Sequence, residues 1–438
     1  MVTVARHAVI RRISPPVRRC LIQRARLGIR AVVSRPSLIN KAFRPFGSVA
    51  GSDQLSRNTA FEGERDGSKM RTRAAVLWAP GEPWSVESIE LDEPRYGEVL
   101  VRLVATGLCH SDEHMRDGTN VMKYPFIGGH EGSGVVERVG AGVHDLEQGD
   151  HVVFSFIPAC GRCRACSKGM SSVCDMGAHL GIGLQISDGT ARHRARDKDA
   201  HLMCVTGTFA EHTVVHESSC IKITTDVPLD KAALVGCGVT TGWGSSVYVG
   251  EVTAGDSVVI LGMGGVGCGA VQGAAQAGAR HVVVVDPSEF KRSEAKRFGA
   301  THVAESAEEA LDLLRELTWG AMADVVVITV DKMTGQHVAP AMALLGKGGI
   351  CVQVSVGDPT ETSIDISLID LTSMRKSIRG SWYGNANPRS DVPLLLRLYM
   401  EGKLRLDEMI TKTYTLDEIN DGFEDMRRAE IIRGVIVF

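Results

Sequence analysis

A cysteine and a histidine stand 21 residues apart in the first half of the chain, each beside glycines. Cys109 lies in the run Gly-Leu-Cys-His-Ser-Asp-Glu-His, and His130 lies in Gly-Gly-His-Glu-Gly. Thiolate and neutral imidazole are ligands that zinc prefers, and a catalytic zinc takes three protein ligands and keeps one position open. We expect Cys237, in Gly-Cys-Gly-Val-Thr-Thr-Gly, to be the third ligand. The alternative is a set of buried free cysteines and a hydrogen-bonded core histidine.

Four further cysteines form a compact group. Cys160, Cys163 and Cys166 are spaced by three residues, and Cys174 follows eight residues later. Four thiolates at this spacing can surround one zinc tetrahedrally and leave no open position, which is typical of a structural site. An iron–sulfur cluster is also compatible with the spacing. We therefore expect two zinc ions per subunit, one catalytic and one structural.

A glycine-rich turn between two hydrophobic segments predicts a dinucleotide site. A strand expected over 257–261 leads into the turn and then a helix around 270–275, and a second strand at 281–285 ends at Asp286. Such glycines let the backbone approach a pyrophosphate at a helix N-terminus. An acid at this position binds the ribose hydroxyls and repels a 2′-phosphate, so NAD is favoured over NADP. The turn consists of Gly262, Met263, Gly264, Gly265, Val266 and Gly267.

The pattern of predicted elements divides the chain in two. From Met70 to about Val235, short strands alternate with turns, which predicts a β-rich domain that carries the metal ligands on loops. From Gly255, strands alternate with helices, which predicts an α/β domain with a doubly wound parallel sheet. Further strands are expected at 72–77, 99–105, 134–139, 151–156, 324–330, 349–356 and 434–438. Further helices are expected at 288–298, 306–317, 336–345, 392–400 and 416–427.

Residues 175–206 are polar and rich in turns. His and Arg residues cluster between Arg192 and His201. Such a cluster can bind a metal or an anion, but a solvated loop is the ordinary outcome for this composition. We therefore expect a loop whose charged side chains face the solvent.

Composition excludes two classes of function. The chain has 438 residues, enough for two or three domains, with 44% hydrophobic and 23% charged residues. It contains no apolar run of about 18 residues, so we expect no membrane association. Residues 70–438 carry a net charge of −13, which gives no reason to expect nucleic-acid binding. Eleven cysteines without a secretory signal indicate a reducing compartment, so we expect a cytoplasmic protein.

Residues 1–69 differ from the rest of the chain. They contain 14 Lys and Arg against 4 Asp and Glu, and the first 50 residues contain no acid. An Arg-rich start without acids is typical of a mitochondrial transit peptide, and translation from a start codon wrongly assigned upstream of Met70 would look similar. A basic arm that binds acidic surfaces is a third interpretation. We favour a spurious or disordered extension, and a mitochondrial location only if this segment is a genuine transit peptide.

The region from Met70 to the C-terminus resembles the medium-chain, zinc-dependent alcohol dehydrogenases. The matching motifs are GLCHSDEH, GGHEGSGVVERVG, GDHVV, CGRCRAC, GCGVTTGWG, GMGGVG and IRGVIVF. The stretches RAAVLW, PGEPWSVE, SFIPACGRC and NPRSDVP are similar to the bacterial N,N-dimethyl-4-nitrosoaniline-dependent branch. That branch holds NAD without exchange and passes electrons to an external carrier, mycofactocin. The resemblance implies a GroES-like catalytic domain at 70–237, a Rossmann NAD-binding domain at 238–382, and a return to the catalytic domain at 383–438.

The resemblance also implies roles for individual residues. Cys109, His130 and Cys237 match the catalytic zinc ligands, with Glu131 as a carboxylate close behind the metal. The structural zinc ligands match Cys160, Cys163, Cys166 and Cys174.

The proton path and the cofactor site are implied in the same way. Ser111 and His114 match the relay that carries the alcohol proton to solvent. Lys291 matches the basic residue beside the adenosine, Arg433 matches the pyrophosphate arginine, and Thr241 joins the glycine turn as a cofactor contact. His110 stands where many relatives carry an arginine. Phe156 matches a wall of the alcohol pocket, and its alternative is an ordinary core aromatic.

These features predict an enzyme that oxidises a primary alcohol to an aldehyde by hydride transfer to tightly bound NAD. An external carrier such as mycofactocin would reoxidise the cofactor. The alternatives are a dehydrogenase with freely exchanging NAD, including a formaldehyde dehydrogenase-like enzyme, and a non-catalytic nucleotide-binding protein. Against a glutathione-dependent enzyme, no cation stands near Ala178, where an arginine would be expected. We expect a homo-oligomer.

Overall fold

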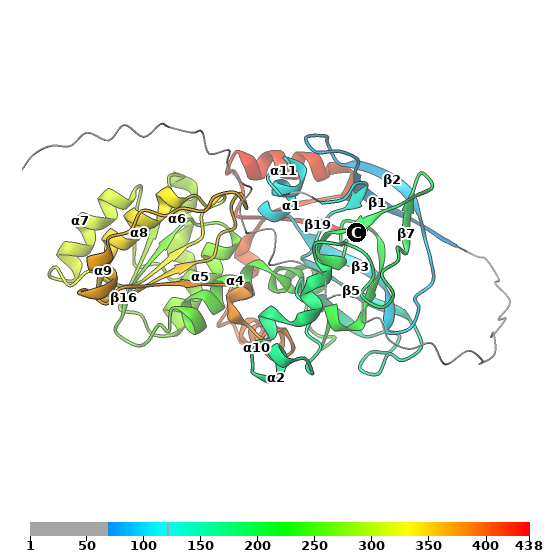
Figure 1. Cartoon of the computed structure of the whole chain (residues 1–438), viewed down its shortest axis with the longest axis horizontal. Coiled ribbons are helices and arrows are strands. Elements are labelled where there is room, and N and C mark those ends of the chain that lie inside the picture. Colours follow the sequence, from blue (N-terminus) through cyan, green and yellow to red (C-terminus); the bar gives the residue numbers. More distant parts are fainter. Residues whose placement is uncertain (1–68, 121) are drawn as a thin grey trace, which may run out of the picture. The chain divides into compact units, whose positions relative to one another are not determined.

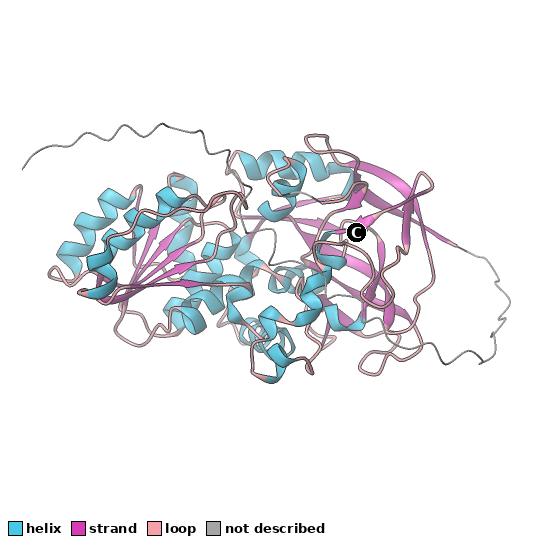
Figure 2. Ribbon diagram, viewed as in Figure 1, coloured by secondary structure: helices cyan, strands magenta, loops and turns pink. Residues whose placement is uncertain are grey.

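The computed structural model describes residues 69–120 and 122–438. The predictions for residues 1–68 therefore lie outside the described part of the chain. A β-rich region built on two sheets and an α/β region built on one parallel sheet make up the described residues (Figures 1 and 2). Within this range, no helix has the length and apolar character needed to cross a membrane.

The β-rich region contains two sheets. The first has the strand order β8-β7-β2-β1-β4-β9, and the second has the order β11-β6-β5-β3-β19-β18, with β10 also paired to β3. The strands of the first sheet are β1 (Met70–Leu77), β2 (Ser85–Leu91), β4 (Phe126–Ile127), β7 (His193–Ala195), β8 (Lys198–Asp199) and β9 (His201–Leu202). Those of the second are β3 (Glu98–Gly107), β5 (Gly132–Val139), β6 (His151–Phe154), β10 (His212–His216), β11 (Cys220–Ile223), β18 (Ile410–Tyr414) and β19 (Arg433–Val437).

The C-terminal strand completes the second sheet. Strand β19 pairs antiparallel with β3, so that Val435 lies opposite Gly107. Leu108, which follows β3, donates its backbone N–H to the carbonyl of Gly434. This pairing brings Arg433 next to the segment that carries Cys109, although the two residues are more than 300 positions apart in the sequence.

The parallel sheet has the order β14-β13-β12-β15-β16-β17, and every pair in it is parallel. Side chains alternate between its faces, because successive residues of a strand point to opposite sides. Val258 and Ile260 share a core with α5, whereas Val259 and Leu261 pack with α7 and α8. The predicted doubly wound sheet is thus confirmed. Its strands are β12 (Ser257–Leu261), β13 (His281–Val285), β14 (His302–Ala304), β15 (Ala323–Ile328), β16 (Leu345–Gln353) and β17 (Ser377–Gly380).

The helices connect the strands and carry several site residues at their N-termini. Helices α4 and α5 pack so closely that a Cβ added to Gly242 would lie 1.9 Å from the carbonyl oxygen of Val266. The helices are α1 (His110–Arg116), α2 (Arg164–Ser167), α3 (Leu229–Ala232), α4 (Gly238–Gly244), α5 (Gly265–Gln276), α6 (Glu289–Ala295), α7 (Ala307–Leu317), α8 (Val338–Leu344), α9 (Leu368–Thr372), α10 (Pro388–Met400) and α11 (Ile419–Arg427).

Several expected elements have different ends, among them β16, which spans Leu345–Gln353 instead of 349–356. The physical reason is visible for two others. The strand expected at 151–156 stops at Phe154, since the hydroxyl of Ser155 donates to the carbonyl of Ile157 and turns the chain. The helix expected at 392–400 begins earlier, at Pro388, where Asn387 caps it by accepting a hydrogen bond from the backbone N–H of Arg389. Proline suits this first helical position because its missing N–H would have no partner there.

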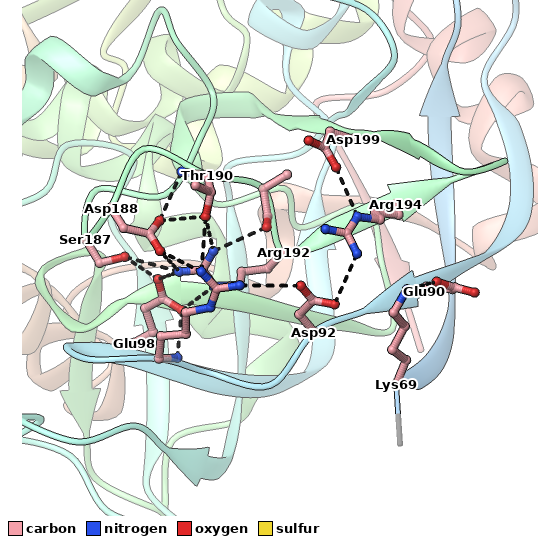
Figure 3. Close-up of polar contacts among 12 residues, drawn as sticks. Lys69, Glu90, Asp92, Glu98, Ser187, Asp188, Thr190, Arg192, Arg194 and Asp199 are labelled. Carbon is pink, nitrogen blue, oxygen red and sulfur yellow. Dashed lines mark hydrogen bonds and ion pairs between the residues drawn. The ribbon is translucent and has the colours of Figure 1, made fainter. Parts of the chain in front are cut away.

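The prediction of a solvated loop at 175–206 is only partly right, because residues 180–192 form turns and loops but the segment also carries strands and a buried charge. This segment contributes β7, β8 and β9 to the first sheet. Arg192 is fully buried and donates two hydrogen bonds to the carboxylate of Glu98, at 2.8 and 2.7 Å. It also contacts Asp188 at 2.8 Å and Thr190 at 2.6 Å (Figure 3). A buried guanidinium needs such partners. Asp188 and Thr190 are local, but Glu98 lies on the distant strand β3, which the local composition does not reveal.

Candidate functional site

Four buried side chains meet where the β-rich region faces the parallel sheet. Cys109 precedes α1, His130 and Glu131 precede β5, and Cys237 precedes α4. The backbone N–H of Gly107 donates to the carbonyl of Glu131, at 2.9 Å, and so joins the first two segments. One ligand atom from each of the four residues lies within 4.8 Å of the others. The expected set of Cys109, His130 and Cys237 is therefore brought together.

The charges of this cluster fit a metal ion. A hydrogen bond between the two thiols lowers the pKa of Cys109 well below its ordinary value and raises that of Cys237. One carboxylate oxygen of Glu131 is buried without a hydrogen-bond partner, and the other is bonded to the guanidinium of Arg433. Arg433 supplies one positive charge, but one carboxylate oxygen still lies unpartnered among the cysteine sulfurs and His130, where a further cation would stabilise it. The donor types and their spacing suit zinc.

Asp112, which is not among the site residues expected from the sequence, supports the histidine of the cluster. Its Oδ2 lies 3.2 Å from Nδ1 of His130, and its Oδ1 accepts the backbone N–H of Gly129 at 2.7 Å. Asp112 is fully buried. A carboxylate on one ring nitrogen orients a ligating imidazole and leaves the other nitrogen for the metal. The signal was available, because Asp112 lies in the same GLCHSDEH motif as Cys109.

The second cysteine group lies in one short loop around α2. The sulfur of Cys174 is 3.6 Å from that of Cys160 and 3.9 Å from that of Cys163, and the sulfurs of Cys160 and Cys166 are 4.0 Å apart. Four sulfurs bound tetrahedrally at about 2.3 Å from zinc would be about 3.8 Å apart. Backbone N–H groups of Cys166 and Asp175 point at the Cys163 sulfur and lower its pKa to about 6. The loop thus fits a closed zinc site.

The glycine turn has the shape that a dinucleotide needs. Gly262 has a φ of +98°, which favours glycine, and α5 begins at the turn without a side-chain cap. Nothing lies within 4 Å of the place where a Cβ on Gly264 would stand. The carboxylate of Asp286, at the end of β13, accepts the N–H of Met263 at 2.8 Å. Open space above uncapped helical N–H groups fits a pyrophosphate.

One cavity of about 1070 Å³ joins the cluster to the glycine turn. The remaining expected cofactor contacts also line it. Lys291 lies in the first turn of α6, where its backbone N–H donates to the capping Ser288. The side chain of Arg433 lies so close to Gly265 that a Cβ added to this glycine would collide with it. The hydroxyl of Thr241 is buried without a partner. Among the expected site residues, the lining includes Cys109, Ser111, His130, Cys237, Gly262, Gly264, Gly265, Val266 and Asp286.

His114 is held by a residue that the sequence reasoning missed. Its Nε2 lies 3.1 Å from Oδ1 of Asp331, just beyond β15, and Nε2 of His110 lies 3.7 Å from the same oxygen. Burial disfavours a charged imidazole, but the hydrogen bond and the negative charge of Asp331 outweigh it and raise the pKa of His114. Ser111 and His114 both line the cavity.

Phe156 forms part of an aromatic wall beside the cluster. Its ring centroid lies 5.8 Å from that of His130, 4.7 Å from that of Tyr383 and 5.7 Å from that of Trp382. The edge-to-face geometry is favourable for aromatic pairs. All three aromatic residues line the cavity, so their rings form an apolar wall beside the cluster.

The sequence matches two protein families in succession. Residues 95–225 match the alcohol dehydrogenase GroES-like domain, and residues 265–401 match the zinc-binding dehydrogenase domain. The chain is 47% identical over 368 residues to alcohol dehydrogenase B of Mycobacterium tuberculosis, covering 84% of this chain and 98% of the relative. It is 48% identical to the NDMA-dependent alcohol dehydrogenase of Amycolatopsis methanolica, covering 84% and 99%.

Solved structures agree with this relationship. An alcohol dehydrogenase zinc-binding domain protein from Burkholderia ambifaria gives a TM-score of 0.80 at 32% identity, covering 84% of this chain and 99% of that one. Benzyl alcohol dehydrogenase from Acinetobacter calcoaceticus gives 0.77 at 30% identity, with the same coverage. The chain belongs to the zinc-dependent, medium-chain alcohol dehydrogenases. It is an enzyme whose cofactors are zinc and a nicotinamide dinucleotide, as predicted.

Proposed function

We propose that the chain oxidises a primary alcohol to an aldehyde and passes the hydride to an NAD molecule that stays bound between turnovers. An external redox carrier such as mycofactocin then reoxidises the bound cofactor. The observation that carries this proposal is the similarity to the Amycolatopsis methanolica enzyme over nearly its whole length. That relative is named for N,N-dimethyl-4-nitrosoaniline (NDMA), a small-molecule electron acceptor.

In this proposal Cys109, His130 and Cys237 would hold the catalytic zinc, and Glu131, paired with Arg433, would stand close to these ligands as a supporting carboxylate. The four cysteines of the loop, Cys160, Cys163, Cys166 and Cys174, hold the structural zinc. Bound zinc supplies a Lewis acid that lowers the pKa of the alcohol, and bound NAD supplies the hydride acceptor. Asp112 keeps His130 in the tautomer and orientation that a ligand needs.

The chain's own groups position the cofactor and remove the proton. The open turn at Gly264 and the helix behind it receive the pyrophosphate, with Arg433 as the nearby cation. Asp286 binds the ribose hydroxyls and disfavours a 2′-phosphate, so the dinucleotide is NAD. The alcohol proton passes by way of Ser111 to His114, and the carboxylate of Asp331 stabilises the imidazolium that results.

The aromatic wall selects the alcohol. Phe156 lies between the rings of His130 and Tyr383, so the carbon chain of a substrate at the metal cluster meets apolar surface. Apolar walls with few polar groups are typical of pockets that bind hydrophobic small molecules. We propose a primary alcohol whose substituent packs against Phe156.

The proposal is tested by extracting the cofactor. Purified protein is dialysed extensively and denatured, and the supernatant is assayed for NAD. We expect about one NAD per subunit, and turnover that needs an artificial electron acceptor such as NDMA but no added NAD. If no NAD is retained and turnover saturates with added NAD, the enzyme exchanges its cofactor freely, as a formaldehyde dehydrogenase-like enzyme would.

We further propose a homo-oligomer that associates through the parallel sheet. Strand β17 lies at the edge of this sheet, and the preceding helix α9 exposes Leu368 and Ile369, which are 76% and 62% accessible. Exposed apolar side chains beside a sheet edge favour pairing with a second copy. Light scattering after size-exclusion chromatography tests this, and a monomer at micromolar concentration would contradict it.

A further inference from the structure

Two polar bridges connect opposite walls of the large cavity. One wall is formed by α1 and the turn that follows it, and the other by the residues just after β15. Nε2 of His114 lies 3.1 Å from Oδ1 of Asp331, and Nζ of Lys332 donates to the hydroxyl of Thr119 at 2.6 Å. Nζ of Lys332 also lies 3.8 Å from the carboxylate of Asp117. The adjacent residues Asp331 and Lys332 thus contact both α1 and the turn that follows it.

The bridge between His114 and Asp331 lies in the lining of the cavity that contains the proposed dinucleotide site, and the bridge between Lys332 and Thr119 lies close to it in the sequence of both segments. His114, from α1, and Asp331, from the segment after β15, meet in the lining of this cavity, which also includes Gly264 and Asp286. Separating the two walls requires breaking both bridges, because each joins the β-rich region to the parallel-sheet region. A ligand held between the walls is released only when they separate far enough.

We propose that these six residues form a latch that slows the release of NAD: His110, His114, Asp117, Thr119, Asp331 and Lys332. The inference rests on the proposed function, in which NAD stays bound between turnovers. An enzyme that exchanges its cofactor in every cycle must break such contacts each time, whereas an enzyme that retains it benefits from keeping them closed.

The strength of the latch is moderate. The side chains of Asp331 and Lys332 are 57% and 47% accessible, so water and salt screen their charges. His114 is buried, which makes its hydrogen bond to Asp331 the stronger of the two bridges. We expect the two bridges together to slow NAD release by about tenfold, a factor that hydrogen bonds to charged groups can supply.

The test measures cofactor exchange directly. Holoenzyme is mixed with an excess of isotopically labelled NAD, free nucleotide is removed at intervals, and the bound fraction is analysed by mass spectrometry after denaturation. The variants are Asp331→Asn with Lys332→Met, and Lys332→Met alone. The control is Lys403→Met, which removes an exposed ion pair with Glu401 outside the cavity lining.

We expect the double variant to exchange NAD about tenfold faster than the wild-type protein, Lys332→Met to exchange a few-fold faster, and Lys403→Met to match the wild type. High salt should accelerate the wild type more than the double variant. Slow exchange that is equal in all four proteins would overturn the latch and leave the proposed function intact. Wild-type exchange that is complete on mixing would overturn the retention of NAD itself. If the double variant does not fold, the exchange rate of Lys332→Met tests the latch: a rate equal to that of the wild type would overturn it.

Discussion

The two cysteine clusters of this enzyme use the same chemistry in opposite settings. Cys109 and Cys237 come from segments 128 residues apart and are buried together with His130 at the junction of two regions. The other cluster spans only Cys160–Cys174 and lies in a loop whose cysteines are mostly half-exposed. The first cluster exists only when the whole fold is formed, whereas the second forms from one short segment.

The difference separates function from stability. The buried cluster faces the cavity shared with the glycine turn, so a ligand there can react with a substrate. The loop cluster groups four cysteine sulfurs, which as zinc ligands would fill all four positions and leave none for a substrate. Removing a ligand should therefore stop turnover in the first case and weaken the fold in the second. Four changes break or sharpen this contrast.

The largest effect is expected for Cys109→Ala. Turnover should fall by about a thousandfold or more, since a metal Lewis acid supplies several kcal/mol of transition-state stabilisation. Zinc content should drop from two to one per chain, and the melting temperature should change little. Cys351→Ala, which removes a buried thiol outside both clusters, is the control and should keep both zinc ions. Retained activity in Cys109→Ala would contradict the assignment.

Cys163→Ala should show the opposite pattern. It removes a ligand of the loop, and the free energy of unfolding should fall by roughly 3 kcal/mol or more, because the binding free energy of a structural metal is folding free energy. Chemical denaturation followed by circular dichroism measures this. Molecules that remain folded should keep the activity of the catalytic cluster. An unchanged unfolding midpoint would argue against a zinc ion in the loop.

A smaller effect is expected for Asp112→Asn. The change leaves all three proposed zinc ligands in place but weakens the carboxylate contact with Nδ1 of His130. Loss of such a partner costs about ten- to a hundredfold in metal affinity or activity. Zinc retention against increasing chelator measures the affinity, and Asp175→Asn beside the loop is the matched control. Equal zinc retention in both variants would mean that Asp112 does not support the metal.

The smallest effect concerns the pH profile. Burial lowers the pKa of His114, and the contact with Asp331 raises it by more, so the net shift is upward. Asp331→Ala should therefore lower the pKa of His114. His114 accepts the proton in its neutral form, so the acid limb of kcat/KM for alcohol oxidation should move to lower pH. Asp312→Ala, in an exposed pair with Arg315, should leave the profile in place. A shift to higher pH would contradict the role of Asp331.

Local sequence patterns predicted much of this molecule. The alternation of hydrophobic runs and the glycine turn predicted the parallel sheet, because those signals lie within about 30 neighbouring residues. The four-cysteine loop was predicted for the same reason. The grouping of Cys109, His130 and Cys237 was expected from residue type, and the structure brings them together through the pairing of β3 with β5 and the packing of α4 on α5.

Apart from the catalytic ligand set, contacts between distant segments were not predicted. Asp331 is an isolated acid after β15, and only the tertiary fold places it against His114. Arg192 stands in a polar, turn-rich stretch, so its composition indicated solvent exposure, yet its partner Glu98 lies 94 residues earlier on β3. A charged residue in a polar segment carries no local signal of burial, because the partner that makes burial tolerable is elsewhere in the chain.

The buried pair of Glu98 and Arg192 has a consequence for related sequences. Both side chains are fully buried, and the carboxylate accepts two hydrogen bonds from the one guanidinium (Figure 3). Replacing Arg192 alone leaves the buried carboxylate of Glu98 without its cation, which costs about 3–5 kcal/mol, whereas replacing Glu98 alone leaves Arg192 with Asp188 as its remaining ion-pair partner. Divergence at these two positions should therefore be concerted. Homologues that lack the arginine should also lack the glutamate and carry a neutral pair of similar volume.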